Sequence, residues 1–381
     1  MRRQGEQGSE NVFVQSSVHV ERLLTAADQP GQALFAGFEG TSCPGPLLDL
    51  IAAGRVGGVV LFARNVESPG QVLDLVRQLR AHEPDGAPLV VAIDQEGGRV
   101  QRLRAPWTVW PPMRRLGELV DGDPSSATHD ATAAVARALA LELRDCGIAL
   151  DFAPVVDVDS NPANPVIGDR SFSRDPRQVA AHARAFIGAM QAERVACCAK
   201  HFPGHGDTTL DSHLALPKIA HDLDRLLAVE LPPFAAAVEA GVASVMSAHV
   251  VFEAIDAKRP ATFSPDVIAL LRERLRFDGL VFSDDLEMKA VADHWQPREM
   301  VDLALGAGVD ALLACRSFDL VTALLDRLES LPDATIEPAL RRVASLKQRF
   351  AQPAPEAADA ATPGPPYPDH LALAARLSRT A

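Results

Sequence analysis

The sequence has few cysteines and no long hydrophobic run, and both features narrow the possible architectures. Its five cysteines are odd in number and show no C-x-x-C spacing, which argues against a disulfide scaffold or a zinc ribbon and favours reduced, buried thiols. Nowhere do 18 consecutive apolar residues occur, so no membrane-spanning helix is predicted. The polar N-terminus lacks the apolar core of a secretory signal peptide, and a cytoplasmic protein is therefore expected.

Positive charge is also scarce. Lys and Arg total 37 against 50 Asp and Glu, giving a net charge of −13, and no Lys/Arg cluster offsets this balance locally. An acidic chain repels phosphate backbones, so nucleic-acid binding is not expected. Hydrophobic residues at 47% and charged residues at 23% are typical of globular proteins, which excludes global disorder.

Short apolar runs alternate with amphipathic segments along most of the chain. The runs are rich in β-branched residues and apolar at both alternating positions, as expected for strands buried on both faces. Eight such strands are predicted, at 33–38, 57–62, 88–94, 148–158, 196–202, 244–250, 279–285 and 311–316. Helices are predicted after them from Ser68-Pro69 and Ser264-Pro265, each an N-cap followed by proline at the first helical position. Further helical patterns cover 127–146, 176–192, 223–240, 298–307 and 318–330, after a short first connection at 45–54.

This alternation predicts an α/β fold with a parallel sheet, and eight strands favour a closed (β/α)8 TIM-type barrel over residues 30–350. The alternative, an open doubly wound sheet, calls for a G-x-G-x-x-G turn after the first strand. The sequence instead has Gly37-Phe38-Glu39-Gly40 there. Residues 1–29 are interpreted as an N-terminal extension. Residues 351–381 are interpreted as a Pro/Ala-rich disordered tail with a short helix at 370–378.

Chemically active side chains gather where the predicted strands end. The carboxyl ends of barrel strands form one rim, which is where barrel active sites lie. Six residues are singled out because they converge there: Asp94, Lys200, His201, Asp211, His213 and Asp284. Other polar residues near the rim allow simpler interpretations, with Asp285 as a helix cap and Arg99 and Asp169 as an ion pair.

Two chemistries fit this rim. In the first, a metal held by His201, His205, His213, His249 and Asp284 activates water, but the H-x-H pattern of barrel metallohydrolases is missing after the first strand. In the second, a carboxylate attacks a sugar and a separate acid protonates the leaving oxygen. Asp284 would be the nucleophile. Asp211 and His213 share a face of an extended segment, so the carboxylate could raise the basicity of the imidazole.

Four sequence blocks carry a family resemblance: DQEGGRVQRL, IGDRSF, AKHFPGHGDTTLDSHLALP and VFSDDLEM. They resemble, in order and over essentially all of 30–350, the single-domain NagZ-type β-N-acetylhexosaminidases of glycoside hydrolase family 3. The resemblance implies retaining hydrolysis of terminal, non-reducing β-linked N-acetylglucosamine, with muropeptides of peptidoglycan recycling as substrates. The sequence departs from the family pattern at Glu287, because the family usually has a small polar residue at that position.

The resemblance also implies a role for individual residues. Asp284 matches the nucleophile, His213 the acid/base on a mobile loop, and Asp211 its partner. The positions that hold the sugar match Asp94, Arg102, Arg170, Lys200 and His201. No cofactor and no metal are expected. The protein is expected to be a monomer that binds saccharides. The D-S-H segment separates this pattern from family 3 β-glucosidases. The alternative function is a non-catalytic sugar sensor with the same fold. The presence of both Asp284 and His213 argues against it, because sugar binding alone requires neither a nucleophile nor a proton donor.

Overall fold

The computed structural model describes residues 30–119, 126–209, 211–212, 216–351 and 364–379. Eight parallel strands form a closed barrel in sequence order, and the first pairs with both the second and the last. The strands are β1 (Leu34–Ala36), β2 (Gly58–Leu61), β3 (Val90–Ile93), β6 (Leu150–Asp151), β7 (Ala196–Phe202), β9 (Ser244–Ser247), β11 (Leu280–Asp285) and β12 (Ala311–Ala314). This confirms the predicted (β/α)8 barrel and excludes the open sheet.

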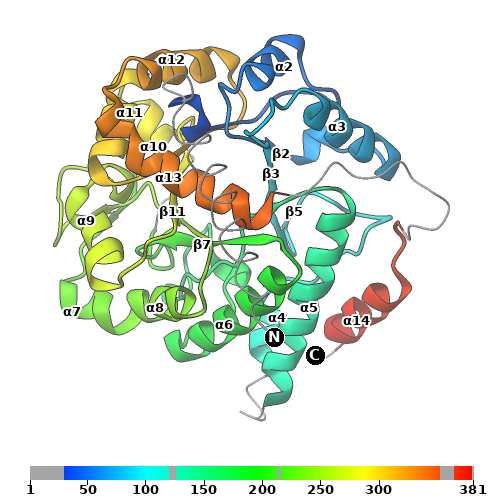
Figure 1. Ribbon diagram of the computed structural model, residues 1–381. Helices are drawn as coiled ribbons and strands as arrows, with labels where there is room; N and C mark the ends of the chain where they lie inside the picture. Colours follow the sequence, from blue (N-terminus) through cyan, green and yellow to red (C-terminus); the bar gives the residue numbers. More distant parts are fainter. Residues whose placement is uncertain (1–29, 120–125, 210, 213–215, 352–363, 380–381) are drawn as a thin grey trace, which may run out of the picture.

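Helices surround the barrel (Figure 1). The outer ring consists of α2 (Gly45–Ala52), α3 (Pro69–Ala81), α5 (Ser126–Asp145), α6 (Pro176–Ala192), α8 (Leu231–Glu239), α9 (Pro265–Ala269), α11 (Pro297–Ala307) and α12 (Phe318–Glu329). Both predicted start signals are confirmed, because the Ser68 and Ser264 hydroxyls accept hydrogen bonds from the backbone N–H groups of Gln71 and Val267 at 3.2 and 3.4 Å. None of the helices in the described parts of the chain has the length and apolarity needed to cross a membrane.

Shorter elements complete the architecture. Three short helices lie between the larger ones, α4 (Arg114–Glu118), α7 (Leu223–Arg225) and α10 (Lys289–Ala292), and two small sheets pair β4 (Gln95–Gly97) with β5 (Val100–Gln101) and β8 (Lys218–Ile219) with β10 (Val251–Phe252). The 3-10 turns are η1 (Pro30–Ala33), η2 (Ala63–Asn65), η3 (Gly168–Arg170) and η5 (Ala261–Phe263), and the π-helical turns are η4 (Leu226–Glu230) and η6 (Leu270–Arg274).

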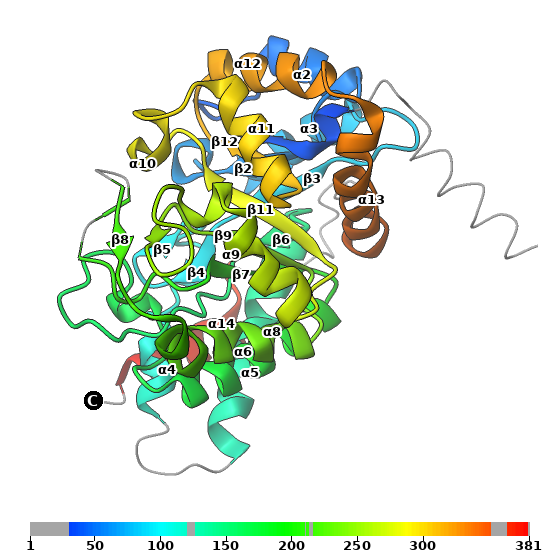
Figure 2. The ribbon, with the colours of Figure 1, turned by 90° about the vertical axis from the view of Figure 1, so that its left-hand side faces the viewer.

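The barrel interior is a packed core. The rings of Phe35 and Phe152 each meet the ring of Phe282 edge to face, at 4.9 and 5.3 Å between centroids, an arrangement that aromatic quadrupoles favour. Helix α13 (Asp333–Phe350) contributes three buried side chains, Val343, Leu346 and Phe350, to the same cluster. Figure 2 shows α13 at one end of the barrel and the β4–β5 hairpin at the other. No helix was predicted over 333–350, so α13 is an addition to the expected architecture.

The C-terminal segment is ordered where the structure describes it. Helix α14 (Pro368–Arg379) buries Ala374 and Leu377 and packs against α4 and α5. The short helix expected at 370–378 is thereby confirmed, whereas the prediction of a disordered tail is wrong for residues 364–379. The helix is stabilised by its buried apolar side chains, Ala374 and Leu377, which the Pro/Ala-rich composition of the segment did not reveal. The predicted N-terminal extension, 1–29, and residues 352–363 lie outside the described residues.

Candidate active site

A cavity of 310 Å³ opens at the carboxyl ends of the barrel strands. Its polar lining comes from the ends of β7 and β11 and from the segments after β3, β6 and β7. Val60 of β2, Met246 of β9 and Leu313 of β12 contribute apolar side chains. The residues that matter for the chemistry are Asp94, Glu96, Arg102, Arg170, Lys200, His201, His205, Ser212, Asp284 and Asp285. Six of the eight predicted site residues therefore line one cavity: Asp94, Arg102, Arg170, Lys200, His201 and Asp284.

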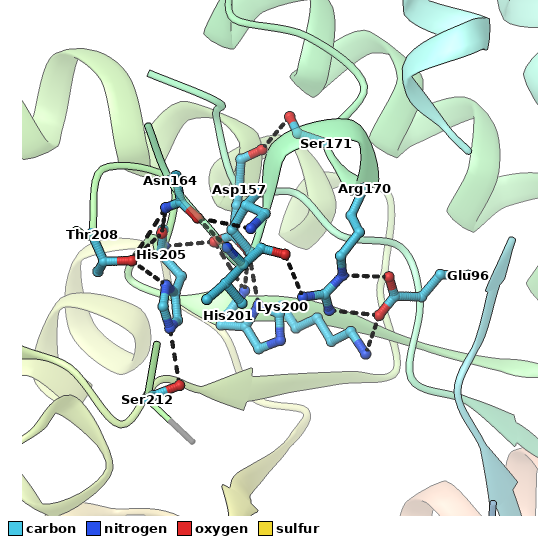
Figure 3. A network of polar contacts seen from close by, with 12 residues as sticks. Glu96, Asp157, Asn164, Arg170, Ser171, Lys200, His201, His205, Thr208 and Ser212 are labelled. Atoms are coloured by element: carbon cyan, nitrogen blue, oxygen red, sulfur yellow. Dashed lines mark hydrogen bonds and ion pairs between the residues drawn. The ribbon is translucent and has the colours of Figure 1, made fainter. Parts of the chain in front are cut away.

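A network of charges forms one wall of the cavity. The Lys200 ammonium donates to Asp94 Oδ1 and lies against Glu96 Oε1, each at 2.7 Å, and Arg102 donates to Asp94 Oδ2 at 2.9 Å. Arg170 forms two hydrogen bonds of 2.8 Å to the Glu96 carboxylate (Figure 3). Burial opposes ionisation of both carboxyls, but the surrounding cations hold the pKa of Asp94 well below its usual range and lower that of Glu96 to about 2.

Loop geometry places these side chains. Gly97, at the end of β4, and Gly98, directly after it, adopt positive φ angles of 93° and 59°, where a Cβ would collide with Pro111 and Pro112. The turn returns the chain so that Arg102 faces Asp94. The predicted Arg99–Asp169 pair is confirmed at 3.1 Å, and it ties this hairpin to the 3-10 turn that carries Arg170.

Asp157 organises the end of β7. Its carboxylate accepts hydrogen bonds from the backbone N–H groups of His201 and His205, at 3.1 and 2.7 Å, and lies 2.8 Å from His201 Nδ1 (Figure 3). Asp157 thus sets the direction of the His201 ring, and a ligand in the cavity would meet the other ring nitrogen. Asp157 is not among the site residues predicted from the sequence.

Two adjacent carboxyls on β11 have opposite properties. Burial would raise the pKa of Asp284, but His201, His249, the backbone N–H of Asp285 and Lys200 together lower it. Burial and the neighbouring carboxylates of Glu287 and Asp284 raise the pKa of Asp285 to about 7. Neighbouring titratable groups whose pKa values are driven apart are typical of catalytic sites. The interpretation of Asp285 as a helix cap is wrong. Its carboxylate accepts a 3.1 Å hydrogen bond from the Glu287 N–H in the turn after β11, whereas the next helix, α10, begins after Met288 and has no side-chain cap.

The D-S-H segment is described up to its second residue. Ser212 lines the cavity, its hydroxyl lies 3.2 Å from His205 Nε2, and its carbonyl accepts a 3.2 Å hydrogen bond from the Ala290 N–H. Burial lowers the pKa of His205 to about 4, so its ring is neutral near pH 7. Asp211 is half-buried next to Ser212. His213 lies outside the described residues, and the expected Asp211–His213 geometry therefore stays a prediction.

Three carboxyl groups that could replace His213 as the proton donor already have other partners. Glu96 is held ionised by Arg170 and Lys200, Asp207 pairs with His221, and Glu39 pairs with Arg316 at 2.7 Å. Three or more metal-ligating side chains do not come together anywhere in the described residues. His249, a candidate ligand in the metal interpretation, instead has its Nδ1 2.8 Å from the Thr262 hydroxyl.

The chain is similar to a known protein family and to individual members of it. The model of the glycosyl hydrolase family 3 N terminal domain matches residues 47–346. A beta-hexosaminidase of Methylococcus capsulatus is 43% identical over 294 residues, covering 76% of this chain and 84% of that protein. One from Bordetella parapertussis is also 43% identical, over 301 residues, with coverages of 78% and 83%.

Solved structures of the same family are also similar to this chain. A family 3 β-N-acetylglucosaminidase from Paenibacillus has a TM-score of 0.85 and 37% identity, over 93% of this chain and 68% of that one. NagZ from Neisseria gonorrhoeae, in complex with N-trifluoroacetyl-D-glucosamine, has a TM-score of 0.70 and 34% identity, over 82% of this chain and 97% of that one.

Proposed function

Because the chain belongs to glycosyl hydrolase family 3 and is a β-N-acetylhexosaminidase, we propose that it removes terminal, non-reducing β-linked N-acetylglucosamine from muropeptides. N-acetylglucosaminyl-1,6-anhydro-N-acetylmuramic acid is the proposed substrate, and peptidoglycan recycling in the cytoplasm, by a monomer, is the proposed setting. The observation that carries the proposal is the position of Asp284, a carboxylate kept ionised in a cavity whose facing wall is built from cations and hydrogen-bonding carboxylates.

The first step uses Asp284 as the nucleophile. Its carboxylate oxygen forms a bond to the anomeric carbon while the glycosidic C–O bond breaks, and an ester of inverted configuration results. A nucleophile must carry its lone pair free of a proton, and the lowered pKa of Asp284 meets this requirement at neutral pH. Asp285, with its higher pKa, keeps a second negative charge away from Asp284 below pH 7.

The proton comes from His213 in this proposal. Its imidazolium protonates the leaving oxygen in the first step, and the neutral ring then accepts a proton from the water that attacks the ester, which restores both groups and retains the configuration. Asp211 stabilises the protonated ring. Support comes from Ser212, whose side chain and carbonyl are both hydrogen-bonded at the cavity wall, and from the low pKa of Glu96, which disqualifies that carboxyl as an acid.

The charged wall holds the sugar. Asp94 already accepts from Lys200 and Arg102, and a carboxylate has further lone pairs with which to accept from hydroxyl groups. Lys200, Arg170 and His201 are donors to the oxygens of the ring substituents. Ion pairs with carboxylates fix the orientation of Arg170 and Lys200 before a sugar binds, which lowers the entropy cost of binding.

The test compares leaving groups. His213→Ala should slow a disaccharide far more than an activated nitrophenyl N-acetylglucosaminide, because only the poor leaving group needs protonation. Asp211→Asn should show the same pattern more weakly. The proposal fails if His213→Ala slows both substrates equally and leaves breakdown of the glycosyl-enzyme unimpaired. Release of N-acetylglucosamine from the anhydro-muropeptide, followed by mass spectrometry, tests the substrate itself.

A further inference from the structure

Helix α14 lies outside the stretch that matches the family domain, which ends at residue 346. It runs beside α5 on the outer surface of the barrel (Figure 1). Ala374 and Leu377 anchor it through buried apolar contacts. Apolar burial alone would dock a helix anywhere with a matching groove, so the polar contacts of α14 are what define its position.

Two side chains at the start of α14 bind carboxylates of α5. The Tyr367 hydroxyl donates to Asp145 Oδ2 at 3.0 Å, and His370 Nδ1 lies 2.8 Å from Glu142 Oε1. The Glu142 side chain is only 2% exposed, so its hydrogen bonds face little competition from water. Tyr367 and His370 also stack on one another, with centroids 5.1 Å apart.

Glu142 links α14 to the loop between β5 and α4. Its other oxygen, Oε2, accepts a hydrogen bond from the Thr108 N–H at 3.3 Å. The His370 ring lies 6.1 Å from the buried ring of Trp110 in the same loop. The loop is therefore held between α14 and α5 on one side and the β4–β5 hairpin on the other.

The loop in turn holds the hairpin. The Trp110 carbonyl accepts from the Gly98 N–H at 2.9 Å, and the Trp110 N–H donates to the Gln101 side chain at 3.0 Å. The Gln101 amide also donates to the Thr108 carbonyl at 2.6 Å. Every one of these bonds ends on the turn or on β5, directly beside Arg102, whose guanidinium donates to Asp94.

We propose that α14 is a brace for the β4–β5 hairpin, and that His370 and Tyr367 are positioning residues for sugar binding. They touch no substrate. They act through Glu142, Thr108 and Trp110 on Arg102 and Asp94. The proposal rests on saccharide binding in the cavity and adds an element from outside the family domain to the binding site.

The principal experiment compares His370→Ala with His370→Asn in the full chain, using steady-state kinetics on a nitrophenyl N-acetylglucosaminide. His370→Ala should raise KM by about three- to tenfold with kcat unchanged, since a hydrogen bond to a buried charged group is lost and the loosened hairpin binds the sugar less well. His370→Asn keeps an N–H donor near the position of Nδ1 and should recover most of the affinity. Asp369→Asn, at an exposed position on the same helix, is the matched control and should leave KM unchanged.

Amide hydrogen exchange on the unliganded protein supplies a readout that needs no turnover, so the brace can be judged even if the proposed substrate is wrong. Exchange should rise in peptides covering 95–110 in His370→Ala and stay unchanged in α12. Tyr367→Phe, which removes a single hydroxyl, should give a smaller rise and serves if His370→Ala does not fold. Unchanged KM and unchanged exchange over 95–110 would overturn the proposal. A lower kcat at constant KM would also overturn the proposal, because that pattern indicates that a smaller fraction of the variant is folded.

Discussion

Replacing Glu96 with glutamine should destabilise the protein far more than a change of one atom suggests. Glu96 is 2% exposed and is bonded to two cations, Arg170 through both carboxylate oxygens and Lys200 at 2.7 Å. Glutamine keeps the shape but removes the charge, and its NH2 group points a donor at side chains that can only donate. Both cations stay buried with one counter-charge fewer.

Two independent arguments give a similar magnitude. Breaking a buried ion pair by removing one partner costs about 3–5 kcal/mol. The pKa of Glu96 falls from 4.5 to about 2 on folding, and this shift corresponds to about 3 kcal/mol of stabilisation at neutral pH. A typical domain is stable by about 5–15 kcal/mol, so Glu96→Gln should still fold at 25 °C but with a clearly lower unfolding midpoint.

Urea unfolding at pH 7 measures this effect, and an exposed pair supplies the control. Arg99 and Asp169 pair at 3.1 Å with side chains 46% and 48% exposed, so Asp169→Asn should cost less than about 1 kcal/mol. The pH dependence has a definite sign. Because folding lowers the pKa of Glu96, its contribution is complete above about pH 4.5 and is lost as the pH falls toward 2, so the difference between wild type and Glu96→Gln should shrink in acid. A Glu96→Gln effect no larger than that of Asp169→Asn would refute the reasoning.

Three further predictions concern the reaction and its pH range. Asp284→Ala should lose several orders of magnitude in kcat while remaining folded, whereas a mutant with about a tenth of wild-type activity would exclude Asp284 as the nucleophile. Asp285→Asn keeps the oxygen that accepts the Glu287 N–H. It should raise the melting temperature at pH 8 but not at pH 4, because a carboxyl whose pKa folding raises to about 7 stabilises the fold below pH 4 and loses that contribution as the pH rises through 7. Dialysis against EDTA should leave kcat/KM unchanged, and recovery with one divalent metal after a loss would contradict this.

The sequence predicted the barrel well because each strand is apolar on both faces and each is followed by a helix signal. The predicted strand at 148–158 was too long: β6 covers only Leu150–Asp151. Pro154 has no N–H to donate to a neighbouring strand, which explains the early end of regular pairing. The convergence of Asp94, Lys200 and Asp284 on one cavity was also predictable, since the ends of parallel strands meet at one rim.

The rest of the site depends on contacts between distant segments. Glu96 lies two residues after Asp94, but its partner Arg170 comes from a turn after the next barrel strand. Asp157 contributes mainly by accepting backbone N–H groups, a role that leaves no pattern in the sequence. Helix α14 could be located from its composition, yet its link to the β4–β5 hairpin runs through Glu142, whose burial appears only in the fold.

The packed interior of the barrel has a consequence for the order of events in turnover. Phe35, Phe152 and Phe282 pack in the barrel interior together with side chains of α13, so the described residues close the cavity toward the barrel core. In the proposed reaction the sugar becomes bonded to Asp284 as its bond to the aglycone breaks. The aglycone must therefore go first and the sugar last. Free N-acetylglucosamine should accordingly be a competitive inhibitor, and the rate at which this product dissociates from the cavity sets an upper limit on kcat.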